Sequence, residues 1–180
     1  MKKSNKYLLY SSIITFTITC IWIYFFKCNV ISGDMRFFYA EVKIQWIPDS
    51  SLFLEDGSFS FANLVLYILN VIGFMMFGFL LGGAFKKKRI LVVTIISILF
   101  SIFIETLQGI FAFGSVELSD VICNSLGGFL GVFIYHKLEN KMSDLFKNIF
   151  YLIVTIISSC CIIIGIGLTI HFWPQYIEFV

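Results

Sequence analysis

Residues 90–110 read ILVVTIISILFSIFIETLQGI, and this stretch decides the fold. It is a run of about 20 largely apolar residues, the length that an α-helix needs to cross the hydrocarbon core of a bilayer. Ser97, Ser101, Glu105 and Gln108 interrupt the run at helical spacing, so they share one face. Polar side chains at membrane depth are costly and usually face the interior of a helix bundle. The stretch therefore predicts a membrane helix that packs through a polar face.

Four further stretches have similar length and composition: Tyr7–Phe26, Ala62–Phe85, Leu118–His136 and Phe150–Phe172. Of the 180 residues, 59% are hydrophobic and 13% are charged, whereas soluble domains have roughly 25% charged residues. We therefore predict an all-α integral membrane protein, a bundle of about five transmembrane helices. A formal net charge of +2 provides no basic stripe for phosphates, so we expect no nucleic-acid partner.

Cationic residues are concentrated on one side of the predicted membrane. Ten of the 13 Lys and Arg residues precede the first span, join the second span to the third, or join the fourth to the fifth. The other three, Lys27, Arg36 and Lys43, lie on the opposite side. Because positively charged loops stay in the cytoplasm, we expect the N-terminus inside and the C-terminus outside.

We expect four segments along the chain. Residues 1–28 form an N-terminal membrane helix, whose apolar run is too long for a cleaved signal peptide. Residues 29–61 form an extracytoplasmic loop, 62–136 a three-helix core, and 137–180 a cytoplasmic linker with the fifth helix. The loop mixes helix and strand periods. It either lies on the outer leaflet or covers a site below it.

Polar residues gather in the outer half of three spans. Asn70 lies about 12 Å along the second span from its outer end, and Glu105 lies roughly 8 Å below the outer end of the third. Glycines four residues apart, as at Gly78 and Gly82, allow such helices to approach closely. We expect one ligand-binding cluster between the three helices, formed by Asn70, Glu105, Gln108, Asp120 and Asn124.

Two interpretations of this cluster are open. In the first, the residues form a hydrogen-bonded clasp between helices and bind nothing. In the second, they line an outward-facing polar cleft that binds a membrane lipid, or a lipid-linked or lipidated ligand.

Catalysis is a further alternative, with Glu105 and Asp120 as acid and base. The cluster contains no His, no G-x-S-x-G motif and no metal-ligand spacing. We therefore expect binding, with no catalytic residue, metal or cofactor. The alternatives are an integral-membrane enzyme acting on a lipid-linked substrate and a non-catalytic membrane scaffold.

Three segments of this region resemble the VanZ-like family of membrane proteins. Residues 70–78, NVIGFMMFG, look like the family's N-x-x-x-F-x-P-x-G segment. Residues 101–108, SIFIETLQ, look like its S-x-x-x-E-x-x-Q segment, and residues 119–128, SDVICNSLGG, like its D-x-x-x-N-T-x-G-[AG] segment. The resemblance covers about residues 62–136 together with a first helix, and it places the same polar residues in the family's motifs.

This chain departs from the family pattern at three positions. It has Met76 where the family usually has Pro, Gly114 where it usually has Arg, and Glu117 where it often has Asp. Without that Arg to neutralise the carboxylates, we expect Glu105 to be protonated. The family's founding member is associated with resistance to the glycopeptide antibiotic teicoplanin. The resemblance therefore implies a multi-pass protein of the bacterial plasma membrane that affects how a lipidated antibiotic meets the envelope.

Overall fold

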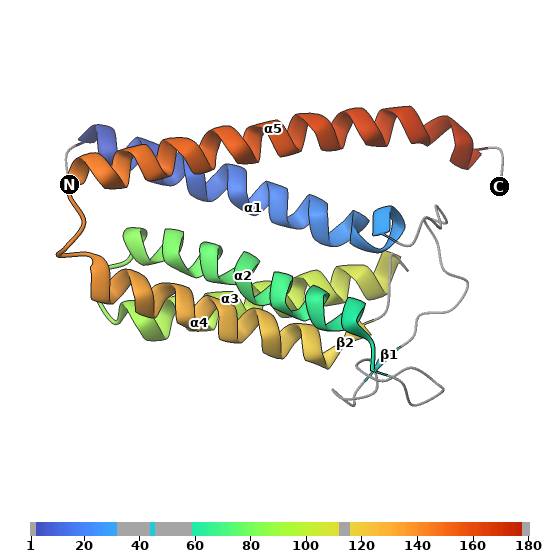
Figure 1. Ribbon diagram of the computed structural model, residues 1–180, viewed down its shortest axis with the longest axis horizontal. Coiled ribbons are helices and arrows are strands. Elements are labelled where there is room, and N and C mark those ends of the chain that lie inside the picture. The colour runs from blue at the N-terminus through green and yellow to red at the C-terminus, as the bar shows by residue number, and fades with distance from the viewer. Residues whose placement is uncertain (1–2, 32–43, 46–58, 112–115, 178–180) are drawn as a thin grey trace. The chain divides into compact units, whose positions relative to one another are not determined.

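A computed structural model of the chain describes residues 3–31, 44–45, 59–111 and 116–177 (Figure 1). The helices are α1 (Lys3–Ile31), α2 (Phe61–Ala84), α3 (Arg89–Phe111), α4 (Leu118–Leu138) and α5 (Asp144–Ile177). Two short strands, β1 (Ile44–Gln45) and β2 (Val116–Glu117), pair in parallel. All five helices are long enough and apolar enough to cross a membrane. The predicted all-α class and its five candidate spans are therefore confirmed.

Two helices are longer than their predicted spans by several residues. α1 extends beyond Tyr7–Phe26 at both ends, and α5 extends beyond Phe150–Phe172 at both ends. A hydropathy criterion finds only the part of a helix that suits lipid, whereas polar turns continue the helix outside it. Ser143 marks the start of α5: its Oγ accepts a hydrogen bond from the Phe146 backbone N–H at 3.1 Å. This is an N-cap, which satisfies a backbone donor that would otherwise lack a partner.

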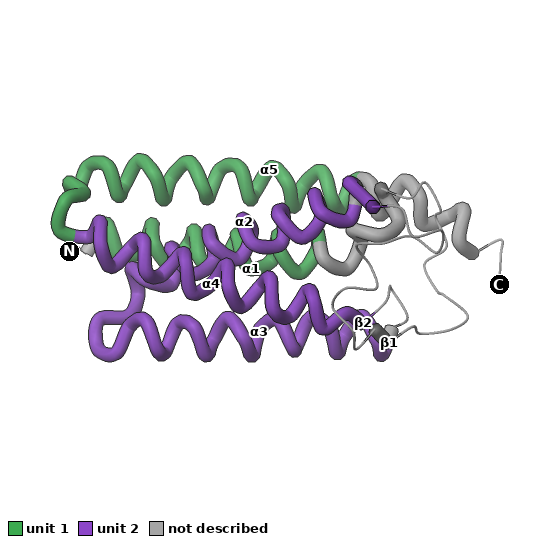
Figure 2. Tube along the Cα trace, turned by 60° about the horizontal axis from the view of Figure 1, so that its bottom comes forward, with its two compact units in different colours: residues 1–39, 140–180 green, residues 40–139 purple. Residues whose placement is uncertain are grey.

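The chain divides into two compact units (Figure 2). Residues 1–39 and 140–180, which contain α1 and α5, form the first unit. Residues 40–139, which contain α2, α3, α4 and both strands, form the second. The helices of the predicted core at residues 62–136 thus belong to a single unit, while the first and last helices pair with each other.

In the first unit, α1 and α5 run in the same direction. Near their starts, Asn148 Nδ2 donates a hydrogen bond to Asn5 Oδ1 at 3.1 Å. Farther along both helices, Gly165 lies against the indole ring of Trp22. A methyl group built on Gly165 would lie 2.6 Å from Trp22 Cε2. The absence of a side chain at this glycine therefore makes room for the indole.

The hydroxyl groups of α1 bond to their own helix. Four of them donate to backbone carbonyl oxygens three or four residues earlier, at 2.7–3.0 Å: Ser12, Thr15, Thr17 and Thr19. Thr19 Oγ1 also lies 3.1 Å from the carbonyl oxygen of Ser158 in α5. Because a bilayer core offers no water, such bonds satisfy hydroxyl groups that would otherwise oppose burial in lipid.

In the second unit, α4 packs against both α2 and α3, and most extensively against α2. α2 and α4 run in the same direction, because Tyr67 contacts Ser119 near their starts and Gly82 contacts Tyr135 near their ends. α3 runs the opposite way between the two connections. This arrangement brings the first half of α2, the second half of α3 and the first turns of α4 to one end of the unit.

Glycines bring the backbones of α2 and α4 into contact. A methyl group built on Gly131 would lie 2.8 Å from the backbone nitrogen of Phe79 and closer still to the Met75 carbonyl oxygen. One built on Gly78 would lie 2.9 Å from the Cα atom of Gly128. These distances are shorter than an ordinary contact of about 3.5 Å, so a side chain does not fit without moving a helix. The close approach predicted from the glycine spacing is confirmed.

At the opposite end of the unit, an ion pair joins α3 to the residue that follows α4. Arg89, only 7% exposed, donates from both terminal nitrogens to the two carboxylate oxygens of Glu139, at 2.9 Å for the Nη2 bond. Its Nε donates to the Phe85 carbonyl oxygen, and the guanidinium lies 5.1 Å from the centre of the Tyr135 ring. A bidentate pair of this kind is strong and directional. It therefore fixes the α2–α3 connection against the end of α4.

Candidate functional site

The second unit buries polar side chains and exposes apolar ones. All five predicted site residues are at most 8% exposed: Asn70, Glu105, Gln108, Asp120 and Asn124. On other faces of the same three helices, Ile72, Ile102 and Ile122 are about half exposed. This is the reverse of a water-soluble protein and suits a helix bundle surrounded by lipid. Glu105 faces the interior of the bundle.

The polar face predicted on α3 is confirmed. Ser97, Ser101, Glu105 and Gln108 are all buried, whereas Thr106, the neighbour of Glu105, is exposed. Thr106 Oγ1 donates to the Ile102 carbonyl oxygen of its own helix. α3 therefore presents acid, amide and hydroxyl groups to its neighbours and covers its lipid face with apolar groups and satisfied hydroxyls.

Asn70 of α2 and Asp120 of α4 are joined directly. The Asn70 Nδ2 group donates to Asp120 Oδ1 at 2.7 Å. Asp120 lies in the first turn of α4, where the helix dipole and the free backbone N–H groups favour a carboxylate. The two side chains thus link parallel helices at the end of the unit where α4 begins.

Asn124, one turn farther along α4, is fully buried and bonds to α3. Its Nδ2 donates to Ser101 Oγ at 2.9 Å. Asp120 and Asn124 therefore reach different partners, one on α2 and the other on α3. α4 is the element that connects the polar groups of the other two helices.

Glu105 holds the connection between α3 and α4. Its Oε2 accepts a hydrogen bond from the backbone N–H of Glu117 at 3.0 Å. Glu117 is the second residue of β2 and is paired with Gln45 of β1. The strand at residues 44–45 therefore pairs with the segment that is bonded to the Glu105 carboxyl group. Residues 32–43 and 46–58 of the predicted loop, and Gly114, lie outside the described residues.

Tyr67 also belongs to this end of the unit, and the sequence analysis missed it. Tyr67 donates from its hydroxyl group to Ser119 Oγ at 3.1 Å, and the same hydroxyl lies 3.5 Å from Glu117 Oε2. Tyr67 stands three residues before Asn70, on the same face of α2. Its spacing was therefore a usable signal, but tyrosine is also common at membrane interfaces and does not stand out there.

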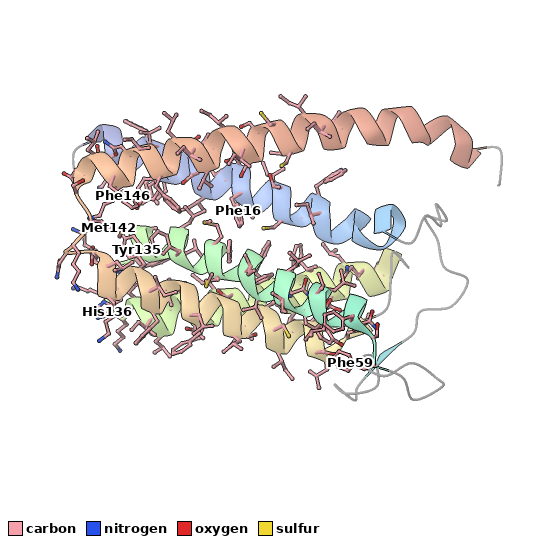
Figure 3. The ribbon with its side chains drawn as sticks, in the orientation of Figure 1. Phe16, Phe59, Tyr135, His136, Met142 and Phe146 are labelled. Atoms are coloured by element: carbon pink, nitrogen blue, oxygen red, sulfur yellow. The ribbon has the colours of Figure 1, made fainter. Side chains whose placement is uncertain are left out.

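Three separate hydrogen bonds each tie one or two of the predicted residues to a neighbouring segment. Asn70 joins Asp120, Asn124 joins Ser101, and Glu105 joins the Glu117 backbone. Gln108 is buried one turn beyond Glu105, on the same face. Figure 3 labels Phe59, which lies two residues before the start of α2, at this end of the unit.

The cluster can both donate and accept hydrogen bonds. Amides do both, tyrosine and serine hydroxyls do both, and ionised carboxylates accept only. Three acids, Glu105, Glu117 and Asp120, belong to this end of the unit. Such a set suits hydroxyl, amino and peptide groups of a polar headgroup. Within the described residues, no group of three or more His, Cys, Asp or Glu side chains is arranged to hold a metal ion.

Comparison of the sequence with known proteins finds one family. The family model described as VanZ/LLP1 matches residues 13–146, which include all five predicted site residues. Protein VanZ of Enterococcus faecium is 35% identical over 128 residues, covering 70% of this chain and 71% of that protein. No solved structure matches the chain.

Proposed function

The chain belongs to the VanZ/LLP1 family, and on that premise we propose that it is a multi-pass protein of the bacterial plasma membrane that binds an amphiphile in its polar cluster. The ligand is a lipid, a lipid-linked precursor or a lipidated glycopeptide. Binding gives resistance to glycopeptides of the teicoplanin type. The N-terminus lies in the cytoplasm, which places the cluster near the outer surface of the membrane.

The observation that carries this proposal is the burial of two acids and one amide on α3 and α4 beside an apolar, lipid-facing surface. Glu105, Asp120 and Asn124 are at most 8% exposed. Polar groups at membrane depth are expensive and usually serve a function. Hydrogen-bonding groups at this end suit a headgroup or sugar, and the exposed isoleucines nearby suit an acyl chain.

Isosteric substitutions separate ligand binding from a clasp between helices. In Glu105→Gln, the amide oxygen still accepts the bond from the Glu117 N–H, and in Asp120→Asn the amide oxygen still accepts the bond from Asn70. Both variants therefore keep the helix contacts, whereas Asp120→Asn removes a carboxylate and Glu105→Gln replaces an acid that can exchange a proton by an amide that cannot. If the cluster serves only as a clasp, they behave as wild type.

The test is to express the protein in a teicoplanin-sensitive host and to measure the minimal inhibitory concentration. We expect Glu105→Gln and Asp120→Asn to lose protection while their amount in the membrane and their thermal stability stay near wild type. Thr106→Val is the matched control, because Thr106 adjoins Glu105 but is exposed. Protection that survives both isosteric variants contradicts a role for the cluster in binding.

A glycopeptide without an acyl chain tests the class of ligand. A cluster that recognises an amphiphile protects against the lipidated compound and leaves sensitivity to the other unchanged. Equal protection against both compounds would contradict recognition of a lipid-bearing ligand.

A further inference from the structure

The end of the second unit opposite the polar cluster gathers lysine side chains. Lys86, Lys87 and Lys88 form the connection between α2 and α3, and all three are exposed. Lys137, in the last turn of α4, is also exposed. Figure 3 shows nitrogen-bearing side chains at this end, where Tyr135 and His136 are labelled. Four lysines thus come from two elements that are far apart in the sequence.

Packing holds these two elements together. The pairing of Arg89 with Glu139 joins the residue after the lysine run to the residue after α4. The contact between Gly82 and the Tyr135 ring joins the last turns of α2 and α4. The two segments that carry the lysines are therefore held next to each other.

Arg89 takes part in the packing of this end of the unit, whereas the lysine side chains are exposed. Arg89 is buried and is bound by Glu139, by the Phe85 carbonyl oxygen and by the Tyr135 ring. Among the described residues of this end, Glu139 is the acid that forms an ion pair, and it pairs with Arg89. Lys137 has a contact with an aromatic ring, Phe133, at 5.5 Å. The end of the unit therefore carries an excess of positive charge on flexible, exposed ammonium groups.

One lysine occupies a backbone conformation that side chains rarely adopt. Lys88 has a φ angle of 46°, in the left-handed region that favours glycine. The turn into α3 thus has a cation at the position where a glycine would be less strained. The connection keeps three consecutive ammonium groups despite that strain.

Apolar side chains continue directly from the lysines. Leu91 on α3 and Phe133, Ile134 and Leu138 on α4 are all exposed, at 37% or more. A soluble polyanion gains nothing from such a surface, whereas a phospholipid matches it with acyl chains below and a phosphate above. We propose that Lys86, Lys87, Lys88 and Lys137 form a binding site for the headgroup of an anionic phospholipid, with its chains along α3 and α4.

The experiment uses the full-length protein purified in detergent micelles, so that its orientation in a membrane does not matter. Native mass spectrometry measures how much phosphatidylglycerol and how much phosphatidylcholine the protein retains when both are added at equal concentration. Since each basic residue near an anionic surface contributes about 1 kcal/mol, Lys86/Lys87/Lys88→Gln is expected to weaken the preference for phosphatidylglycerol roughly 100-fold. The corresponding Lys→Arg variant is expected to keep it.

A matched control distinguishes a local site from diffuse charge. The variant Lys6/Lys141/Lys147→Gln removes three lysines from the first unit and is expected to keep most of the preference. An equal loss in both glutamine variants would overturn the proposal of a local site, and an unchanged preference in Lys86/Lys87/Lys88→Gln would overturn any role of these lysines.

Two measurements on the wild-type protein need no variant. Raising the salt concentration from about 0.05 M to 0.5 M is expected to abolish the preference, because added ions screen exposed charges. Inorganic phosphate at the concentration of the lipid is expected to leave the bound phosphatidylglycerol in place. Salt-independent retention, or displacement by phosphate, overturns the assignment to an anionic phospholipid.

Discussion

Replacing Gly165 by Ala tests how closely α1 and α5 pack. The added methyl group would lie 2.6 Å from Trp22 Cε2 and 2.9 Å from Cζ2. An ordinary contact is about 3.5 Å, so the indole or one helix must move by about 0.9 Å. Gly167 provides the matched control two residues farther along α5, because a methyl group there meets nothing within 4 Å.

The magnitude follows from comparing the two substitutions. Overpacking of a close contact costs about 1–3 kcal/mol. Both substitutions gain the same helix propensity, which favours Ala over Gly by about 1 kcal/mol. The difference between Gly165→Ala and Gly167→Ala therefore isolates the packing term. We expect Gly165→Ala to be less stable than Gly167→Ala by about 1–3 kcal/mol.

The assay is equilibrium unfolding in mixed micelles with increasing dodecyl sulfate, followed by circular dichroism and tryptophan emission. A double-mutant cycle repeats both glycine substitutions in a Trp22→Ala background. Once the indole is absent, Gly165→Ala is expected to cost no more than Gly167→Ala, so the coupling energy equals the packing penalty of about 1–3 kcal/mol. Equal stability of the two alanine variants in the wild-type background, or a penalty that persists without Trp22, would refute the packing described here.

Three further predictions concern the second unit. Gly131→Ala is expected to destabilise the protein by about 1–3 kcal/mol in the same unfolding assay, because the methyl group meets the backbone of the facing helix, which no rotamer change relieves; a wild-type midpoint would argue against that contact. Glu139→Gln is expected to cost about 1–3 kcal/mol and more than Arg89→Gln, because it leaves a buried guanidinium without its carboxylate, and the reverse order of thermal midpoints would contradict this. Asn124→Ala is expected to cost about 1 kcal/mol, with a coupling of about 0.6 kcal/mol to Ser101→Ala in a double-mutant cycle, and additive effects would show that the bond contributes nothing.

The helices and the polar face of α3 could be predicted because both signals are local. A run of about 20 apolar residues identifies a span, and the spacing of Ser97, Ser101, Glu105 and Gln108 identifies one face. The predicted fourth span begins at Leu118, where α4 begins, and this start puts Asp120 in the first turn of the helix. Each of these inferences needs only the residues of one helix.

The partners within the site could not be predicted, because they depend on the register between helices. Asn124 bonds to Ser101 and Tyr67 to Ser119, and neither pair has a spacing that one helix determines. The pairing of β1 with β2 involves two residues on each side, too few for a strand pattern to be recognised.

The different environments of the cations at the other end of the unit could not be predicted. In the sequence, Arg89 directly follows three lysines, and nothing local distinguishes it from them. In the structure it is buried against Glu139, whose position in the chain is 50 residues away. The lysines stay exposed while the arginine forms a bidentate pair, consistent with the different geometry of the two cations.

The pairing of α1 with α5 has a consequence for biosynthesis. α1 emerges from the ribosome first, and at 5–20 residues per second its partner follows on the order of ten seconds later. During that interval α1 resides in the bilayer without the helix it will contact. The hydroxyl groups of Ser12, Thr15, Thr17 and Thr19 already donate to backbone carbonyl oxygens of α1 itself. These four groups therefore need no hydrogen-bond partner from α5 during that interval.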